Sequence, residues 1–265
     1  MLIEEPVDAV CFTGSHATGV QVAAAVAPHL RRVQLELGGK DPVYVCDDVD
    51  VAATAAAVAD GAFYNTGQSC CAVERVYVHA RVWVRFVEAF VDAVRGYVVG
   101  DPLDSRTYIG PLARRELALD ALAEQVADAA AHGAHVLTGG ERLARPGFFF
   151  APIVLVDVDD TMRVMREETF GPLVGLAPVA SDEEALARMN DTDYGLTAAV
   201  YTPDRERAER LLTRVNTGTA YWNCCDRVSP RLPWTGRGAS GLGVTLGREG
   251  IATFLRPKAW HLRGT

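Results

Sequence analysis

The run VDAVCFTGSHATGVQVAAAVAPHLRRVQLELGG, residues 7–39, contains the pattern that decides the fold. Two short apolar runs, residues 7–12 and 33–37, flank an alanine- and valine-rich stretch of helical character at residues 18–30. A strand, a helix and a second strand within about 30 residues form a βαβ unit whose two strands are parallel. This stretch therefore predicts an α/β fold.

The rest of the chain continues the alternation of helical and strand patterns. Amphipathic or alanine-rich stretches predict helices at residues 50–64, 81–98, 111–132, 181–189 and 204–215. Short apolar runs predict strands at residues 75–79, 136–138, 153–158, 173–178, 197–201 and 219–223. Such alternation is typical of a mostly parallel sheet flanked by helices.

Composition excludes several classes of partner. The chain has 265 residues and a formal net charge of -8, which argues against nucleic acid or anionic lipid as the main partner. We expect no membrane span, because no apolar run approaches the roughly 18 residues that a spanning helix needs. The N-terminus has no signal-peptide pattern and the six cysteines have no scaffold-like spacing, so we expect a cytoplasmic protein. We expect no metal site, since three or four convergent ligands are not evident.

The strongest chemical signal is FYNTGQSCC, residues 63–71. There a helix is expected to end, Gly67 turns the chain, and Cys70 follows in a short loop before a strand. A nucleophilic thiol needs such a placement, held by rigid elements but outside them. Glu36 stands at the end of the second parallel strand, where ligand sites of parallel sheets collect. The two side chains can supply a nucleophile and a general base.

These two stretches resemble the cysteine and glutamate signatures of the aldehyde dehydrogenase superfamily. Further stretches fit the same family in the same order: Phe12 to Ser15, Glu167 to Pro172, Asn190 to Leu196, Asn223, and Ser240 to Gly243. The chain departs from the family pattern after Gly243, where Val244-Thr245 replaces a frequent Arg-Glu pair. The resemblance covers nearly the whole chain and implies a soluble oxidoreductase.

The resemblance implies a role for each matching residue. Cys70 would add to an aldehyde carbon to form a thiohemiacetal, and Glu36 would activate the water that hydrolyses the later thioester. The cofactor, NAD or NADP, would be bound by Gly14, Ser15, Gly38, Glu168 and Phe170. Trp234 would form a wall of the substrate tunnel. The physical rivals are a packing role for Trp234 and a plain helix N-cap for Ser15.

The resemblance also implies a domain division and partners. We expect residues 1–38 to be a remnant of a Rossmann-like dinucleotide-binding domain, and residues 39–241 to form the catalytic domain. Residues 242–265 would form a C-terminal helix and tail with a possible role in oligomerisation. The chain would then be the C-terminal part of the family pattern, without its N-terminal half. Expected partners are a small-molecule aldehyde and either a second copy or a complementary N-terminal chain.

Three functional interpretations follow from these residues. The first is a split or truncated aldehyde dehydrogenase, whose activity as an isolated chain would be impaired. The second is a non-catalytic remnant or subunit of a split enzyme. The third is hydrolysis of thioesters or esters without a cofactor, with Cys70 and Glu36. A literal G-x-G-x-x-G match at residues 236–241 follows no convincing strand, and we interpret it as a loop.

Overall fold

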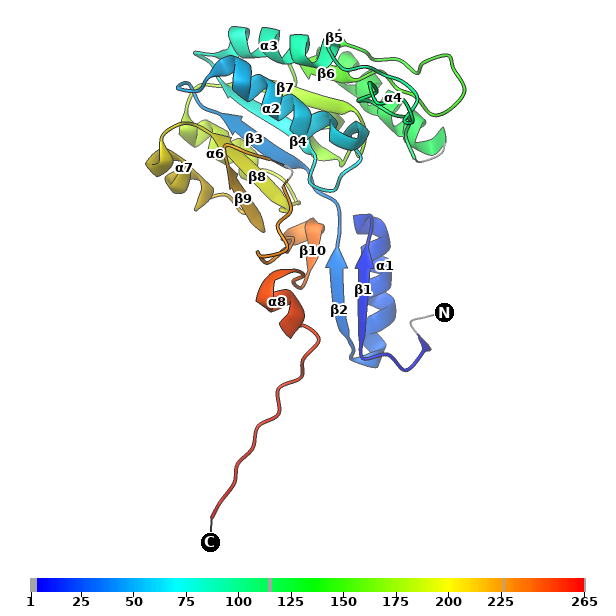
Figure 1. Ribbon diagram of the computed structural model, residues 1–265, viewed down its shortest axis with the longest axis vertical. Coiled ribbons are helices and arrows are strands. Elements are labelled where there is room, and N and C mark those ends of the chain that lie inside the picture. The colour runs from blue at the N-terminus through cyan, green and yellow to red at the C-terminus, as the bar shows by residue number, and fades with distance from the viewer. Residues whose placement is uncertain (1–3, 114–115, 226, 265) are drawn as a thin grey trace.

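A computed structural model describes residues 4–113, 116–225 and 227–264. Its strands form two separate sheets, one of seven strands and one of three (Figure 1). The larger sheet is parallel except at one edge, and helices cover it, so the predicted α/β class is confirmed. No helix in the described ranges is long and apolar enough to cross a membrane.

The seven-stranded sheet has the order β5-β6-β7-β4-β3-β8-β9. Only β5 and β6 pair in antiparallel fashion. The strands are β3 (Asp41–Val45), β4 (Val73–His79), β5 (His135–Thr138), β6 (Ile153–Val156), β7 (Leu173–Val179), β8 (Thr197–Tyr201) and β9 (Thr219–Trp222). Because parallel strands start at one edge, the loops that precede β3 and β4 lie together there.

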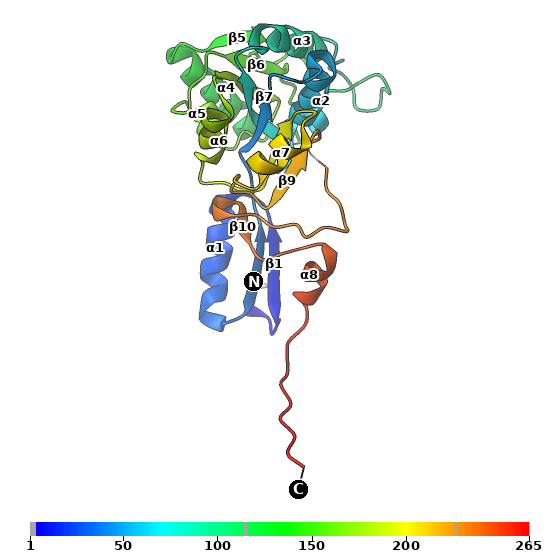
Figure 2. The same cartoon turned by 90° about the vertical axis from the view of Figure 1, so that its left-hand side faces the viewer.

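Helices cover both faces of this sheet (Figure 2). The helices of one face are α2 (Val51–Phe63) and α3 (Trp83–Arg95). Those packed on the other face are α4 (Glu116–Ala131), α5 (Arg163–Arg166), α6 (Asp182–Asn190) and α7 (Arg205–Leu212). The alternation along β3 follows this layering, since Val43 and Val45 join the α2–α3 core while Tyr44 joins the other.

The smaller sheet lies below the larger one in Figure 1 and contains the βαβ unit. Strand β1 (Ala9–Thr13) pairs in parallel with β2 (Arg32–Glu36), and α1 (His16–Val26) connects them. The two-residue strand β10 (Gly241–Leu242) pairs antiparallel with the end of β2. The C-terminal part of the chain thus returns to Glu36, the residue at which β2 ends.

The sequence reasoning missed strand β3. This strand lies between β4 and β8 in the middle of the large sheet, yet it contains Pro42. A proline argues against a central strand because it cannot donate to the ladder. The pairing register of β3 with β4 shifts between Asp41 and Pro42, and this shift accommodates the missing N–H donor at the start of the strand.

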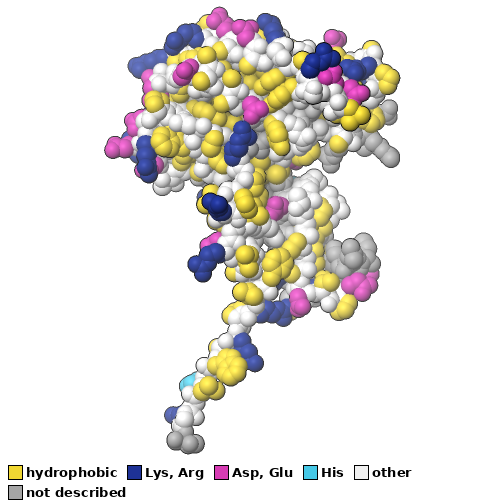
Figure 3. Space-filling view, viewed as in Figure 1, with side chains coloured by type: hydrophobic (Ala, Val, Ile, Leu, Met, Phe, Trp, Pro, Cys, Tyr) yellow, Lys and Arg dark blue, Asp and Glu magenta, His cyan; other side chains and the backbone are white. Residues whose placement is uncertain are grey.

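Other helices begin or end at residues that differ from those expected from the sequence. The helix expected at residues 111–132 is described as Glu116–Ala131, and residues 114–115 of the expected span lie outside the described residues. The last helix, α8 (Gly247–Ala252), is short, and an extended tail follows it. This tail projects from the body with its apolar side chains exposed, among them Phe254 and Trp260, each 72% accessible (Figure 3).

Candidate active site

A cavity of about 360 Å³ brings together seven residues that the sequence pointed to. They come from the ends of β1 and β2, from the segment after α5, and from the loop of residues 64–72 between α2 and β4, here called the cysteine loop. The seven residues are Gly14, Ser15, Glu36, Gly38, Cys70, Glu168 and Phe170. Thr13, Leu37, Gln68 and Ser69 complete the lining. The thiol and the carboxylate therefore face one cavity, as a nucleophile and a base must.

Two polar side chains hold Glu36 from the smaller sheet. Gln34, two residues earlier on β2, donates its Nε2 to Glu36 Oε1 at 3.2 Å. Thr245 donates its hydroxyl to the same oxygen in a short hydrogen bond. Glu36 pairs across the sheet with Gly241 of β10, which brings Thr245 to it. Neither contact was predicted from the sequence, and no local pattern relates residue 245 to residue 36.

The cysteine loop begins with three successive residues in the left-handed region. Their φ angles are 50° at Asn65, 61° at Thr66 and 68° at Gly67. This conformation is costly for a β-branched residue such as Thr66, whose hydroxyl donates to the Gly110 carbonyl at 3.3 Å. A side chain at Gly67 would lie 2.2 Å from the Gly171 carbonyl oxygen. The tight turn thus fixes where Cys70 emerges.

The Cys70 loop and the segment after Glu36 touch at Gly39. A Cβ built on Gly39 would lie 2.7 Å from the Cys70 carbonyl oxygen, so only glycine allows this approach. Asp41 is buried beside the same loop, and its Oδ2 accepts the Thr197 hydroxyl at 2.6 Å. Burial raises the pKa of the Asp41 carboxyl well above its usual range, although the Thr197 hydrogen bonds oppose this.

The far side of the cavity is formed by the segment after α5. A Cβ on Gly38 would lie 2.2 Å from the Glu168 carboxylate oxygens, so this carboxylate lies directly over the glycine backbone. Phe170 has a φ of 49°, which turns the chain back toward the large sheet. Tyr194 lies near Glu168, and burial raises the pKa of its phenol to about 12.

The β1–α1 turn supplies the polar end of the cavity. Gly14 donates its backbone N–H to the Glu36 carbonyl at 3.0 Å, which sets the turn beside the end of β2. Ser15 is the N-cap of α1, and its hydroxyl accepts from the Thr18 N–H at 3.4 Å. The predicted N-cap role of Ser15 is therefore present, and the helix N-terminus behind it favours an anion.

This arrangement fits a dinucleotide. A helix N-terminus suits a pyrophosphate, and a carboxylate such as Glu168, which lies against the Gly38 backbone, suits ribose hydroxyls. Phe170 and Leu37 add apolar lining for a ring. No group of three or more His, Cys, Asp or Glu side chains in the described ranges could hold a metal ion.

Trp234 does not line this cavity. It is 6% exposed and belongs to a small apolar cluster with Cys71 and Leu196, against which Cys70 packs. Trp234 is therefore packed within this cluster, and its role as a wall of the substrate tunnel stays a prediction. The G-x-G-x-x-G match does not line the cavity either; it forms a loop, a short 3₁₀ turn at Gly238–Ser240 and the first residue of β10.

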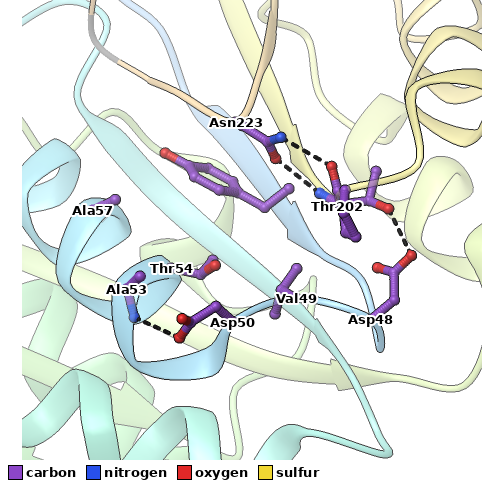
Figure 4. Close-up of a pocket in the computed structure, with 10 residues that line it drawn as sticks. Asp48, Val49, Asp50, Ala53, Thr54, Ala57, Thr202 and Asn223 are labelled. Atoms are coloured by element: carbon purple, nitrogen blue, oxygen red, sulfur yellow. Dashed lines mark hydrogen bonds between the residues drawn. The ribbon is translucent and has the colours of Figure 1, made fainter.

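A second cavity of about 370 Å³ lies beyond the C-terminal ends of β3 and β8 (Figure 4). Its polar side chains already have partners within the protein. Asp48 accepts the Thr202 hydroxyl, Asp50 caps α2 through the Ala53 N–H, and Asn223 bonds the Thr202 backbone. None of the expected cysteine, glutamate or cofactor residues lines it, so we place the candidate chemistry in the first cavity.

Comparisons with known proteins identify relatives of this chain. Residues 1–260 match the model of the aldehyde dehydrogenase family. The chain is 37% identical over 254 residues to aminoaldehyde dehydrogenase 2 of Malus domestica, covering 95% of the chain and 50% of that protein. It is 39% identical over 252 residues to a succinate-semialdehyde dehydrogenase [NADP(+)] of Deinococcus radiodurans, covering 95% and 53%.

A solved structure shares the fold. Betaine aldehyde dehydrogenase from Staphylococcus aureus, determined in complex with NAD+, superposes with a TM-score of 0.90 at 32% identity, covering 94% of this chain and 50% of that one. The chain spans about half the length of the curated relatives it matches. Its assignment to the C-terminal part of the family pattern stays a prediction. On sequence and structure together, the chain belongs to the aldehyde dehydrogenase family.

Proposed function

We propose that the protein oxidises an aldehyde to a carboxylic acid with NAD(P)+, with Cys70 as nucleophile and Glu36 as general base. The observation that carries this proposal is the shared cavity of Cys70, Glu36 and Glu168 beside the α1 N-terminus. The NAD+-bound relative supports the choice of cofactor. The names of the relatives support an aldehyde substrate and leave NAD and NADP both open.

The chain's own residues act at two stages. The Cys70 thiolate would add to the carbonyl carbon, and the backbone N–H of Cys70 would stabilise the developing oxyanion. Bound NAD(P)+ would supply the oxidant for this adduct. Glu36 then takes a proton from water as the water attacks the Cys70 thioester, which releases the acid. Gln34 and Thr245 hold the Glu36 carboxylate for this second stage.

The cofactor would rest between the smaller sheet and the segment after α5. Ser15 and the first turn of α1 would face its pyrophosphate, Glu168 its ribose, and Gly38 and Phe170 its ring. For residues 1–265 assayed alone we expect weak NAD(P)+ binding and slow turnover, because in the described part of the chain the three-stranded sheet has one parallel pair, β1 with β2, and so small a sheet is marginally stable. A complementing N-terminal chain or a second copy of this chain would raise both the affinity for NAD(P)+ and the turnover rate.

The test uses Cys70→Ser and Glu36→Gln, with Cys11→Ser as the matched control because Cys11 is exposed and does not line the cavity. Aldehyde-dependent NADH formation is measured with and without a supplied N-terminal half. We expect Cys70→Ser to lower the rate by at least about a thousandfold. Glu36→Gln should slow thioester hydrolysis by about 10² to 10⁴.

The alternative of a non-catalytic remnant predicts a different result. In that case neither preparation oxidises aldehyde, and iodoacetamide labels Cys70 no faster than the exposed Cys11. Selective labelling of Cys70 at near-neutral pH would instead show an activated thiol. Ester hydrolysis that is lost in Cys70→Ser, without any cofactor-dependent oxidation, would favour the hydrolase interpretation.

A further inference from the structure

Lys40 and Glu74 form an ion pair inside the protein that the proposed mechanism does not use. The Lys40 Nζ lies 2.6 Å from Glu74 Oε2, and the two side chains are 0% and 4% exposed. Burial lowers the pKa of the Lys40 ammonium, and the Glu74 carboxylate opposes this. A pair so fully removed from water needs a reason beyond its mutual attraction, since such pairs contribute little net stability.

The remaining contacts of Glu74 all go to the segment that follows Glu168. Its two oxygens accept the Thr169 N–H at 2.8 and 3.1 Å, and Oε1 accepts the Phe170 N–H at 3.0 Å. Lys40 reaches the same segment, because its Nζ donates to the Thr169 hydroxyl at 3.0 Å. The Thr169 hydroxyl donates in turn to Gln125 Oε1 of α4 at 2.8 Å. Thr169 is thereby fixed at both its backbone and its side chain.

The contacts of this ion pair connect the two walls of the cofactor end of the cavity. Lys40 follows Gly38 by two residues, and Thr169 follows Glu168 directly. The Glu168 carboxylate lies over Gly38 so closely that a Cβ there would be 2.2 Å away. Lys40 and Thr169, which are each within two residues of one wall, are therefore joined through Glu74.

The backbone of the segment also needs external support. Phe170 has a φ of 49°, a conformation that a bulky residue adopts only when its surroundings impose it. Its N–H is bound by Glu74, which supplies that constraint. Charge-assisted bonds to backbone N–H groups are roughly twice as strong as neutral ones, so a carboxylate is well suited to this task.

We propose that Lys40 and Glu74 are positioning residues that fix the separation of Glu168 from Gly38, and thereby set the affinity for the ribose–nicotinamide half of the cofactor. This inference rests on the proposed function, because it takes that cavity end as the cofactor site. It adds two residues that neither touch the cofactor nor belong to the nucleophile and base. Glu74 links the strand that follows the cysteine loop to the segment that carries Glu168.

The test compares Glu74→Gln with the double variant Lys40→Met/Glu74→Gln, in which no buried charge is left without a partner. Asp182→Asn is the control, because the Asp182 carboxylate also accepts hydrogen bonds from two side chains, Tyr44 and Arg207, but lies beyond the opposite ends of the strands. Three quantities are measured on the full chain: amide hydrogen exchange of residues 167–171, the NAD+ dissociation constant by titration to millimolar concentrations, and the rate of Cys70 alkylation.

We expect faster exchange in residues 167–171 in both Glu74 variants and a rise of about tenfold to a hundredfold in the NAD+ dissociation constant. Cys70 alkylation should stay within about twofold of the wild-type rate, which separates positioning from general loosening. Asp182→Asn should change none of the three. Unchanged exchange in the Glu74 variants overturns the proposal, and so does a parallel change of all three quantities.

A failure of the proposed function gives a different pattern. If the wild-type chain binds no NAD+, the cofactor assignment of the cavity fails, and the claim that Lys40 and Glu74 set affinity falls with it. If wild type binds NAD+ and the Glu74 variants bind equally well, only the positioning claim fails. If the double variant unfolds, the amide exchange of residues 167–171 and the NAD+ dissociation constant of Glu74→Gln are sufficient to test the positioning claim.

Discussion

The Glu36 carboxylate is held on one oxygen by two donors that come from different parts of the chain. Gln34 precedes it on β2, and Thr245 arrives from 209 residues away. A hydrogen bond to a charged group contributes about 1.5–3 kcal/mol. Both donors engage Oε1, so Oε2 is the oxygen that would take the proton from water in the proposed mechanism.

Thr245→Val should therefore slow the hydrolysis of acyl-Cys70 by about tenfold, because it removes one of the two hydrogen bonds that orient the base. The measurement loads Cys70 with an acyl group from an activated ester and follows its decay by mass spectrometry. This readout needs no cofactor. Thr245→Ser keeps the hydroxyl, so its acyl-Cys70 should decay at nearly the wild-type rate. Equal decay rates in Thr245→Val and wild type would show that Thr245 does not orient the base.

At the scale of elements, the two-residue strand β10 matters because it pairs with the end of β2. Gly241 stands opposite Glu36, has a φ of 134°, and would place a Cβ 2.0 Å from the Leu35 carbonyl oxygen. No other residue type fits this conformation and this approach together. The strand delivers Thr245 to Glu36 and Ser240 to Leu37, whose N–H bonds the Ser240 carbonyl at 3.0 Å.

Gly241→Ala should lower the free energy of unfolding by about 1–3 kcal/mol, since it adds both backbone strain and a clash. Urea unfolding followed by circular dichroism measures this. Gly133→Ala is the control, because Gly133 has a φ of 96° but nothing within 4 Å of an added Cβ. This control measures the cost of the positive φ alone. A loss of unfolding free energy in Gly241→Ala no larger than in Gly133→Ala would contradict the close approach of Gly241 to the Leu35 carbonyl.

At the scale of the whole molecule, charged groups tie the outer helices to the opposite edge of the large sheet. Arg207 of α7 donates to Asp47 after β3 at 2.8 Å and contacts Asp182 of α6. The hydrogen bonds from Arg207, and then from Arg81, lower the pKa of the Asp47 carboxyl to about 2. An unfolded Asp titrates near a pKa of about 3.9, so the folded state favours the charged form.

The stability that Asp47 contributes is therefore complete above about pH 4 and lost as the pH falls toward 2. Because the site borders solvent, we expect about 1 kcal/mol or less. Asp47→Asn should be less stable than wild type in urea at pH 7, and the difference should shrink at pH 3. A difference that stays constant between these pH values would show that the ion pair is not its source.

The sequence by itself determined the α/β class and the βαβ unit, because each depends on a local period. Contiguous motifs also pointed to seven of the residues that line the cavity. Cys70, Glu36 and Glu168 could be named from the residues around them. The cysteine and glutamate motifs needed no knowledge of strand order. Their family roles remain proposals that the shared cavity supports.

Only the tertiary structure decided which distant residues support that cavity. The contacts of Thr245 with Glu36 and of Glu74 with Thr169 join segments that no periodicity relates. Pro42 concealed β3, since its lack of an N–H is tolerated only because the register shifts there. Trp234 packs in a small cluster with Cys71 and Leu196. Such outcomes depend on strand order and packing, which are properties of the whole chain and leave no mark in a local stretch of sequence.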